Sequence, residues 1–276
     1  MTAQGSHFAR QYLRDDVLPT LYCPGCGCGT VVNCFLKAVE ELGHKNLDRF
    51  AFCSGIGCSS WIPSPHFRAD TIHTTHGRSL AVALGLKLAR PDLKVVVFGG
   101  DGDMVGIGLN HLVQSARRNL DVTAIMVNNM IYGMTGGQVA PTTPSNVKTK
   151  TTPYGSFEYP LDASRLIAAA GASYVAKWTT YHVLQTKESI KQALEHPGFS
   201  FVEIVSQCPP IYGRRVGMET AGKILNWMKE NSIPITRASE LDSETLAEKV
   251  LVGEYVKRDK PSLLENIQRI RRSAAP

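Results

Sequence analysis

Short apolar segments alternate with longer amphipathic ones along this chain, and this alternation restricts the fold more than any other feature. The clearest apolar segment is KVVVF at residues 94–98, and residues 122–127 form a second one. Continuous apolar strands of this kind are typical of parallel sheets that helices cover on both faces. The alternation therefore predicts an α/β fold with a doubly wound, mostly parallel sheet.

The same pattern gives the expected order of elements. We expect strands over residues 50–54, 94–98, 122–127, 174–177 and 199–205, and helices over 31–42, 79–89, 107–118, 161–170, 181–194 and 219–230. Residues 135–155 hold prolines among many threonines and predict a long ordered loop, a kind of segment that usually carries function. We expect one domain over residues 1–232, followed by a polar C-terminal arm over 233–276 with two weak helical patches.

Composition excludes several classes of protein. The chain has 276 residues, of which 43% are hydrophobic, so it can bury a large core. It has no apolar run near the roughly 18–20 residues that cross a bilayer, and residues 1–16 lack the apolar stretch of a secretion signal. A soluble cytoplasmic protein without a membrane partner is expected. The net charge of +6 is not gathered into a basic stripe with aromatic residues, so no nucleic-acid partner is expected.

Two polar motifs directly follow predicted strands. Gly99-Gly-Asp-Gly-Asp103 follows residues 94–98, and Asn128-Asn129 follows residues 122–127. Neighbouring parallel strands bring such ends to one edge of the sheet, where ligands bind. Asp101 and an asparagine offer the oxygen ligands that Mg²⁺ prefers, while glycines and a following helix N-terminus suit a phosphate. A simple turn is the alternative, since Gly-Asp-Gly forms turns readily.

Cysteines form the second set of candidates. With no secretion signal, a disulfide framework is not expected among the seven cysteines. Four lie in separate loop-like motifs, CPGC, GIGC and QCPP: Cys23, Cys26, Cys58 and Cys208. Four thiolates hold either a 4Fe–4S cluster or a structural zinc, and spacing alone does not choose. Cys34 and Cys53 are expected to pack in the core, and Cys28 receives no role.

Together these motifs resemble one family, the thiamine-diphosphate-binding β subunit of 2-oxoacid:ferredoxin oxidoreductases. The matching segments cover most of residues 22–210, in the family's order: YCPGCGCG, SGIGCSS, HTTHGRSLAVALGLKLA, GGDGDMVGIG, VNNMIYGMTGGQVAPTTP and SQCPP. The resemblance implies the thiamine-diphosphate-binding fold, with residues 1–232 as the domain that binds thiamine diphosphate and an iron–sulfur cluster.

The resemblance also implies a role for particular residues. It implies that Asp101, Asn129 and the carbonyl of Ile131 hold Mg²⁺. It implies one 4Fe–4S cluster on the four cysteines of the CPGC, GIGC and QCPP motifs. The remaining residues expected at the cofactor, besides Cys58, are Gly57, Ser59, His76, Gly77, Gly100, Gly102, Asp103, Tyr132, Gly133, Met134 and Thr135.

The implied reaction is the CoA-acylating oxidative decarboxylation of a 2-oxo acid, or the reverse reductive carboxylation, with ferredoxin as electron partner. The segments MTGGQ…PTTP and the later GRR look most like the 2-oxoglutarate type. Many family members instead read YGLTKGQ where this chain reads YGMTGGQ. The favoured reaction is thus 2-oxoglutarate to succinyl-CoA, with pyruvate or a branched-chain 2-oxo acid as the alternative. The second carboxylate of 2-oxoglutarate needs a cation. The candidates are a residue of the partner subunit and, on this chain, His66, Arg68, His73 and Arg78.

The resemblance further implies that the chain is catalytic only with a partner. Family members take the glutamate that contacts the aminopyrimidine ring from an α-type subunit, and no residue here is assigned as catalytic with certainty. Two other functions remain open. A thiamine-dependent decarboxylase or carboligase without a cluster would leave the four cysteines unexplained, and a non-catalytic Cys₄ zinc scaffold would not need the GDG and NN motifs.

Overall fold

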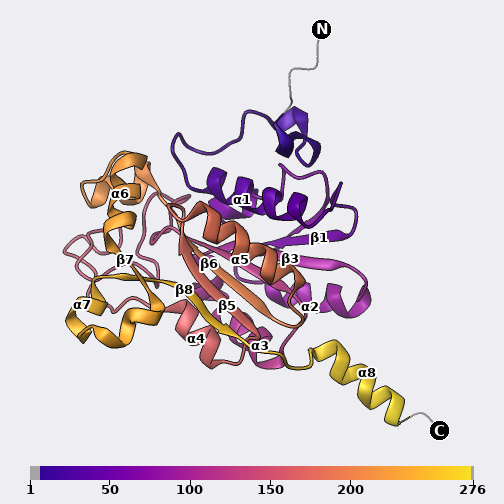
Figure 1. The fold of residues 1–276 in the computed structure, drawn as a ribbon. Helices are drawn as coiled ribbons and strands as arrows, with labels where there is room; N and C mark the ends of the chain where they lie inside the picture. The colour runs from indigo at the N-terminus through magenta and orange to yellow at the C-terminus, as the bar shows by residue number, and fades with distance from the viewer. Residues whose placement is uncertain (1–6, 275–276) are drawn as a thin grey trace.

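An eight-stranded sheet organises the computed structural model, which describes residues 7–274 (Figure 1). The strands follow the order β2-β1-β3-β4-β6-β5-β8-β7, and all neighbours are parallel except β5 and β8. Their bounds are Phe50–Ser54 (β1), Asp70–His73 (β2), Lys94–Gly100 (β3), Thr123–Asn128 (β4), Tyr174–Thr179 (β5), Ser200–Val205 (β6), Ser232–Pro234 (β7) and Val250–Lys257 (β8). The predicted α/β fold with a mostly parallel sheet is confirmed.

Helices cover both faces of this sheet. On one face lie α1 (Cys28–Glu41) and α5 (Val183–Glu195), and on the other lie α2 (Ser79–Ala89), α3 (Leu109–Arg118) and α4 (Ala163–Ala169) (Figure 1). Alternate residues of the central strands supply the two cores, as the period of a strand requires. Phe35 of α1 packs edge-on against Phe52 and Phe98, so the first core is largely aromatic.

The region after residue 220 differs from the sequence prediction. It contains α6 (Ala221–Asn231), α7 (Ser243–Ala247) and α8 (Leu263–Ser273), but also the unpredicted strands β7 and β8. Since β8 pairs with β5, the sheet continues beyond the predicted boundary at residue 233, and the division into two parts stays a prediction. Helix α8 extends away from the sheet and buries none of its residues (Figure 1).

The connections at the strand ends are mostly short, with one exception. Residues 129–162, between β4 and α4, form no helix or strand, so the predicted ordered loop is longer than residues 135–155. Threonines tie this loop together, for instance through a hydrogen bond of 2.7 Å between the hydroxyls of Thr149 and Thr152. No helix among residues 7–274 is both long and apolar enough to span a membrane.

Candidate functional site

A pocket of about 240 Å³ lies where the loops after β1, β3 and β4 meet. This is the carboxyl edge of the sheet, the usual place for a ligand in such folds. Every residue predicted to contact the cofactor lines the pocket except Gly77. Cys28, Ile56 and Val127 line it as well and were not predicted. A larger surface hollow of about 370 Å³, near Phe67, contains none of the predicted cofactor residues.

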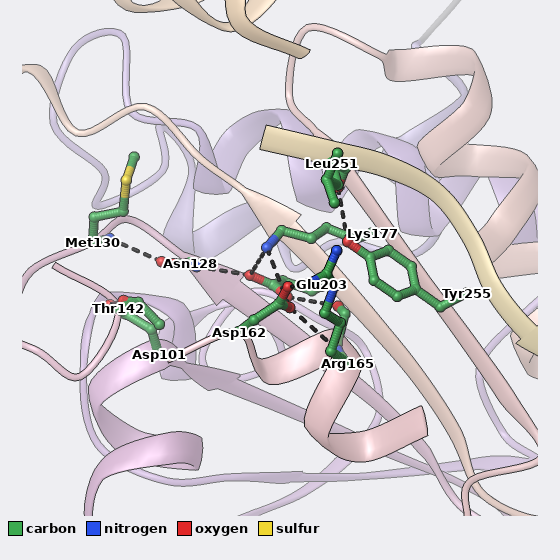
Figure 2. Close-up of polar contacts among 11 residues, drawn as sticks. Asp101, Asn128, Met130, Thr142, Asp162, Arg165, Lys177, Glu203, Leu251 and Tyr255 are labelled. Atoms are coloured by element: carbon green, nitrogen blue, oxygen red, sulfur yellow. Dashed lines mark hydrogen bonds and ion pairs between the residues drawn. The ribbon is translucent and has the colours of Figure 1, made fainter. Parts of the chain in front are cut away.

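Asp101 and Asn129 bring oxygen atoms into this pocket from the ends of β3 and β4. The side chain of Asp101 is buried, and burial raises its pKa to about 7 although the Thr142 hydroxyl donates to its carboxylate (Figure 2). Asn129 accepts a hydrogen bond of 3.3 Å from the N–H of Ile131 through its side-chain oxygen. Carboxylate, amide and carbonyl oxygens form the ligand set that Mg²⁺ takes, and a cation would offset the buried charge of Asp101.

Gly102 has room for no side chain. A Cβ at this position would lie 2.2 Å from the ring of Tyr132, whose hydroxyl donates to the carbonyl of Gly102 at 3.0 Å. Residues Gly102–Ile107 then form a π-type turn, which is rare and often found at functional sites. The N–H groups at the start of such a turn lack partners within it, which favours an anion there.

Asp103 joins three of the loops that form the pocket. Its Oδ1 accepts hydrogen bonds from the backbone N–H of Ile56 (3.1 Å) and of Gly77 (2.8 Å), and it lies 2.7 Å from Nδ1 of His76. Gly77 does not line the pocket, but its backbone N–H helps to position Asp103, which does. Among the described residues, the buried Oγ of Ser59 and Oδ2 of Asp103 have no hydrogen-bond partner. Unpaired buried polar atoms beside a pocket are consistent with a polar ligand such as a diphosphate.

The four cysteines of the CPGC, GIGC and QCPP motifs gather beside this pocket. A Cβ on Gly133 would lie 3.8 Å from the sulfur of Cys208 and 3.9 Å from that of Cys58. Burial, together with the nearby thiols of Cys26, Cys208 and Cys23, raises the pKa of Cys58 to about 11. Segments far apart in the sequence thus converge on one place. Among residues 7–274, no three His, Cys, Asp or Glu side chains are arranged to hold a single metal ion.

The other cysteines separate into two kinds. Cys34 and Cys53 are buried in the two cores, as predicted. Cys28 is different, since it lines the pocket and its thiol lies beside that of Cys26. This contact lowers the pKa of Cys26 and raises that of Cys28. Cys28 is the third cysteine of CPGCGC. Its closeness to Cys26 in the sequence could have indicated a place at the pocket, but the sequence analysis assigned it no role.

The four candidate cations for a substrate carboxylate lie elsewhere. None of the four lines the pocket. Arg68 pairs with Asp15, and Arg78 donates to backbone carbonyls. His66 contacts the carbonyl of Trp61, and His73 contacts the Ser54 hydroxyl. The basic groups nearest to its Met134–Thr135 edge are on the long loop and after β6. A Cβ on Gly136 would lie 2.7 Å from the Lys150 ammonium, and one on Gly137 would lie 2.8 Å from Nε of Arg215.

Comparison with known proteins places these features in one family. The family described as thiamine pyrophosphate enzyme, C-terminal TPP binding domain, matches residues 55–204. The chain is 50% identical over 264 residues to the 2-oxoglutarate synthase subunit KorB of Methanocaldococcus jannaschii, covering 96% of this chain and 97% of that protein. It is 42% identical over 191 residues to the 2-oxoacid:ferredoxin oxidoreductase subunit beta of Saccharolobus solfataricus, covering 68% and 62%.

A solved structure agrees with these relatives. The 2-oxoglutarate:ferredoxin oxidoreductase from Magnetococcus marinus, with 2-oxoglutarate, coenzyme A and succinyl-CoA bound, matches with a TM-score of 0.86 at 36% identity. The match covers 97% of this chain and 91% of that chain. The resemblance inferred from the motifs, including the 2-oxoglutarate type, is confirmed. This chain belongs to the thiamine-diphosphate-binding β subunits of the 2-oxoacid:ferredoxin oxidoreductases.

Proposed function

We propose that this chain, together with an α-type subunit, converts 2-oxoglutarate and coenzyme A to succinyl-CoA and CO₂ and passes two electrons to a ferredoxin, or performs the reverse. The observation that carries this proposal is the pocket itself. Asp101 and Asn129, on the loops after β3 and β4, line the same 240 Å³ pocket as Cys58. Relatives of this chain are named 2-oxoglutarate synthase subunits, which indicates the substrate.

The residues of the pocket fit Mg²⁺ and thiamine diphosphate. Asp101, Asn129 and the carbonyl of Ile131 would hold the cation, and Ser59 offers an unpaired hydroxyl. Thiamine diphosphate, when bound, supplies an electron sink for the loss of CO₂ from a 2-oxo acid. The protein contributes position and exclusion of water, since Tyr132 closes over Gly102 from one side.

The cysteines fit a 4Fe–4S cluster, which four thiolates from separate loops can hold. A structural zinc on the same thiolates is the alternative. Relatives named 2-oxoacid:ferredoxin oxidoreductase subunits favour the cluster, because it can pass electrons to a ferredoxin. We assign the cluster to Cys23, Cys26, Cys58 and Cys208, beside the pocket wall at Gly133.

The second carboxylate of 2-oxoglutarate has two candidate cations on this chain. Neither Lys150 nor Arg215 lines the pocket, but their side chains approach Gly136 and Gly137, which directly follow the pocket residues Met134 and Thr135. An ammonium or guanidinium at that edge suits a substrate with a distal carboxylate and offers nothing to pyruvate.

The pocket also supports the need for a partner. Asp101 and Asp103 are the only carboxylates among the described residues that line it, and each is engaged as described above; no glutamate lines it. This lining supports the proposal that the glutamate that acts on the cofactor comes from the α-type subunit.

The experiment is anaerobic purification of this chain with its α-type subunit, followed by visible absorbance during addition of 2-oxo acids and coenzyme A. Bleaching by 2-oxoglutarate in preference to pyruvate and branched-chain acids is expected. Cys208→Ala should lose the visible absorbance of the cluster, whereas replacement of Cys34, which is buried in the first core, by alanine should keep it. A colourless wild-type complex that contains zinc would contradict the proposal.

A further inference from the structure

A carboxylate is buried in the middle of the sheet, outside the pocket. Glu203 of β6 is 0% exposed, and its two oxygens have different partners (Figure 2). Oε1 accepts a hydrogen bond of 2.8 Å from the side-chain amide of Asn128, and Oε2 accepts one of 2.6 Å from the Ser164 hydroxyl. The Lys177 ammonium lies 3.3 Å from Oε1. A buried charge persists only when it is paired and hydrogen-bonded in this way.

Asn128 connects this carboxylate to the proposed metal site. Its amide nitrogen donates to Glu203, while its amide oxygen accepts a hydrogen bond of 3.0 Å from the N–H of Met130 (Figure 2). Met130 has a φ of 60°, a left-handed conformation that costs energy for a residue other than glycine. The Thr143 hydroxyl holds the carbonyl of the same residue at 2.7 Å. The turn at Met130 is therefore fixed by hydrogen bonds to both the N–H and the carbonyl of this residue.

The acceptor-only chemistry of a carboxylate matters here. An asparagine amide has a donor end and an acceptor end. Because Glu203 accepts and cannot donate when ionised, it selects the orientation in which the oxygen of Asn128 faces Met130. A glutamine at position 203 can present either an oxygen or an NH₂ group to Asn128, so it weakens this selection.

We propose that Glu203 is a positioning residue for the Mg²⁺–diphosphate site: through Asn128 it fixes the turn that presents Asn129 and the carbonyl of Ile131. This inference rests on the proposed function, since it concerns the same two oxygen donors. Glu203 does not line the pocket and touches neither cofactor nor substrate.

Ser164 provides a matched control. Its hydroxyl binds the other oxygen of Glu203 from α4, and Ser164 does not line the pocket. Ser164→Ala therefore removes one buried hydrogen bond of the same carboxylate without touching the turn. Asn128→Ala removes the bonds to Glu203 and to Met130, and Glu203→Gln keeps the shape but loses the charge.

The test measures binding of thiamine diphosphate to the complex by equilibrium dialysis while Mg²⁺ is varied. Asn128→Ala and Glu203→Gln should raise the Mg²⁺ concentration for half-saturation about 10-fold or more, as loss of groups that orient metal ligands does. Excess Mg²⁺ should restore binding, which it would not do for a misfolded protein. Ser164→Ala should keep the wild-type half-saturation although its thermal stability falls.

Two results would overturn the inference, and they differ from failure of the proposed function. If Glu203→Gln keeps the wild-type Mg²⁺ dependence, or if Ser164→Ala shifts it as far as Glu203→Gln does, Glu203 has only a structural role. If Glu203→Gln does not fold, the double variant Lys177→Met, Glu203→Leu decides, because it removes the carboxylate together with its charge partner and leaves Asn128 in place. If the wild-type complex binds no thiamine diphosphate with Mg²⁺, the proposed function itself is wrong.

Discussion

Replacement of Asp101 by asparagine is expected to stabilise the metal-free chain at alkaline pH while it abolishes Mg²⁺ binding. Burial raises the pKa of Asp101 from 3.8 to about 7, against the hydrogen bond from Thr142, which lowers it. Since one pKa unit corresponds to about 1.4 kcal/mol, ionised Asp101 costs the folded chain about 4 kcal/mol. The pKa of Asp101 is higher in the folded chain than in the unfolded one. The stability of the wild type with protonated Asp101 is therefore fully present below about pH 4, and about 4 kcal/mol of it is lost as the pH rises to about 7.

Asparagine removes this pH dependence because it carries no charge. Its new NH₂ group faces groups that donate to the carboxylate in the wild type, and a buried donor that stays unpaired costs about 1–3 kcal/mol at any pH. The stability of Asp101→Asn relative to wild type should therefore rise by about 2–3 kcal/mol between pH 5 and pH 8. At pH 8 the variant should be the more stable protein.

The assay is urea unfolding of the full chain without added Mg²⁺ or thiamine diphosphate, at several values between pH 5 and pH 8. Wild type and variant share every other titrating group, so only their difference is interpreted. Addition of Mg²⁺ and thiamine diphosphate should stabilise the wild type alone. A stability difference that stays constant from pH 5 to pH 8 would refute the reasoning, because it would mean that Asp101 ionises as freely in the folded chain as in the unfolded one.

Three further substitutions test other parts of the site. Thr142→Val should raise the pKa of Asp101 above its value of about 7, since the hydroxyl lowers it, so Mg²⁺-dependent cofactor binding measured against pH should begin at higher pH. Gly102→Ala should abolish cofactor binding in equilibrium dialysis because its Cβ meets the ring of Tyr132 at 2.2 Å, and adding Tyr132→Ala should restore part of it. Lys150→Met should raise the KM for 2-oxoglutarate and leave that for pyruvate unchanged in steady-state assays.

The central fold could be predicted because its strands are buried on both faces. β3 and β4 are almost wholly buried, so their apolar runs stand out in the sequence. β2 could not be predicted, since this edge strand exposes Asp70 and His73 and shows no apolar pattern. β8 has glycine and charged residues after its first three apolar ones. It pairs antiparallel with β5 across an irregularity at Val175–Ala176, which a prediction based on parallel strands does not anticipate.

The site divides in the same way. Asp101 and Asn129 could be located because each directly follows an apolar strand, and parallel pairing of β3 and β4 brings those ends together. The convergence of Cys23 with Cys208 depends on loop paths that spacing does not encode. Four cysteines in separate loops made it a hypothesis, and the family resemblance supported it. Asp103 was predicted at the cofactor, but its bonds to the loops of Ile56 and Gly77 are tertiary contacts that no local pattern reveals.

Glu203 was missed although the sequence carried a signal for it. SFVEIV has one charged residue in a buried strand, and YVAKWT of β5 has one of opposite sign; in the sheet Lys177 and Glu203 are register partners. Charged residues are almost never fully buried unless they are paired. A single charge within each of two apolar strands therefore indicates a buried ion pair, although it does not say what the pair is for.

Stability does not explain why this pair is present, since apolar replacements of buried ion pairs are often neutral or stabilising by about 1–4 kcal/mol. We expect the double variant Lys177→Met, Glu203→Leu to fold, because that gain offsets part of the loss of an acceptor for Asn128 and Ser164, about 1–3 kcal/mol for each, and the remainder is smaller than the stability of a typical domain, about 5–15 kcal/mol. Its Mg²⁺ half-saturation, measured by equilibrium dialysis with thiamine diphosphate, should nevertheless rise as in Glu203→Gln. Wild-type Mg²⁺ affinity in a double variant of normal thermal stability would show that Asn128 holds its turn without the carboxylate, and the pair would then have no part in positioning the metal ligands.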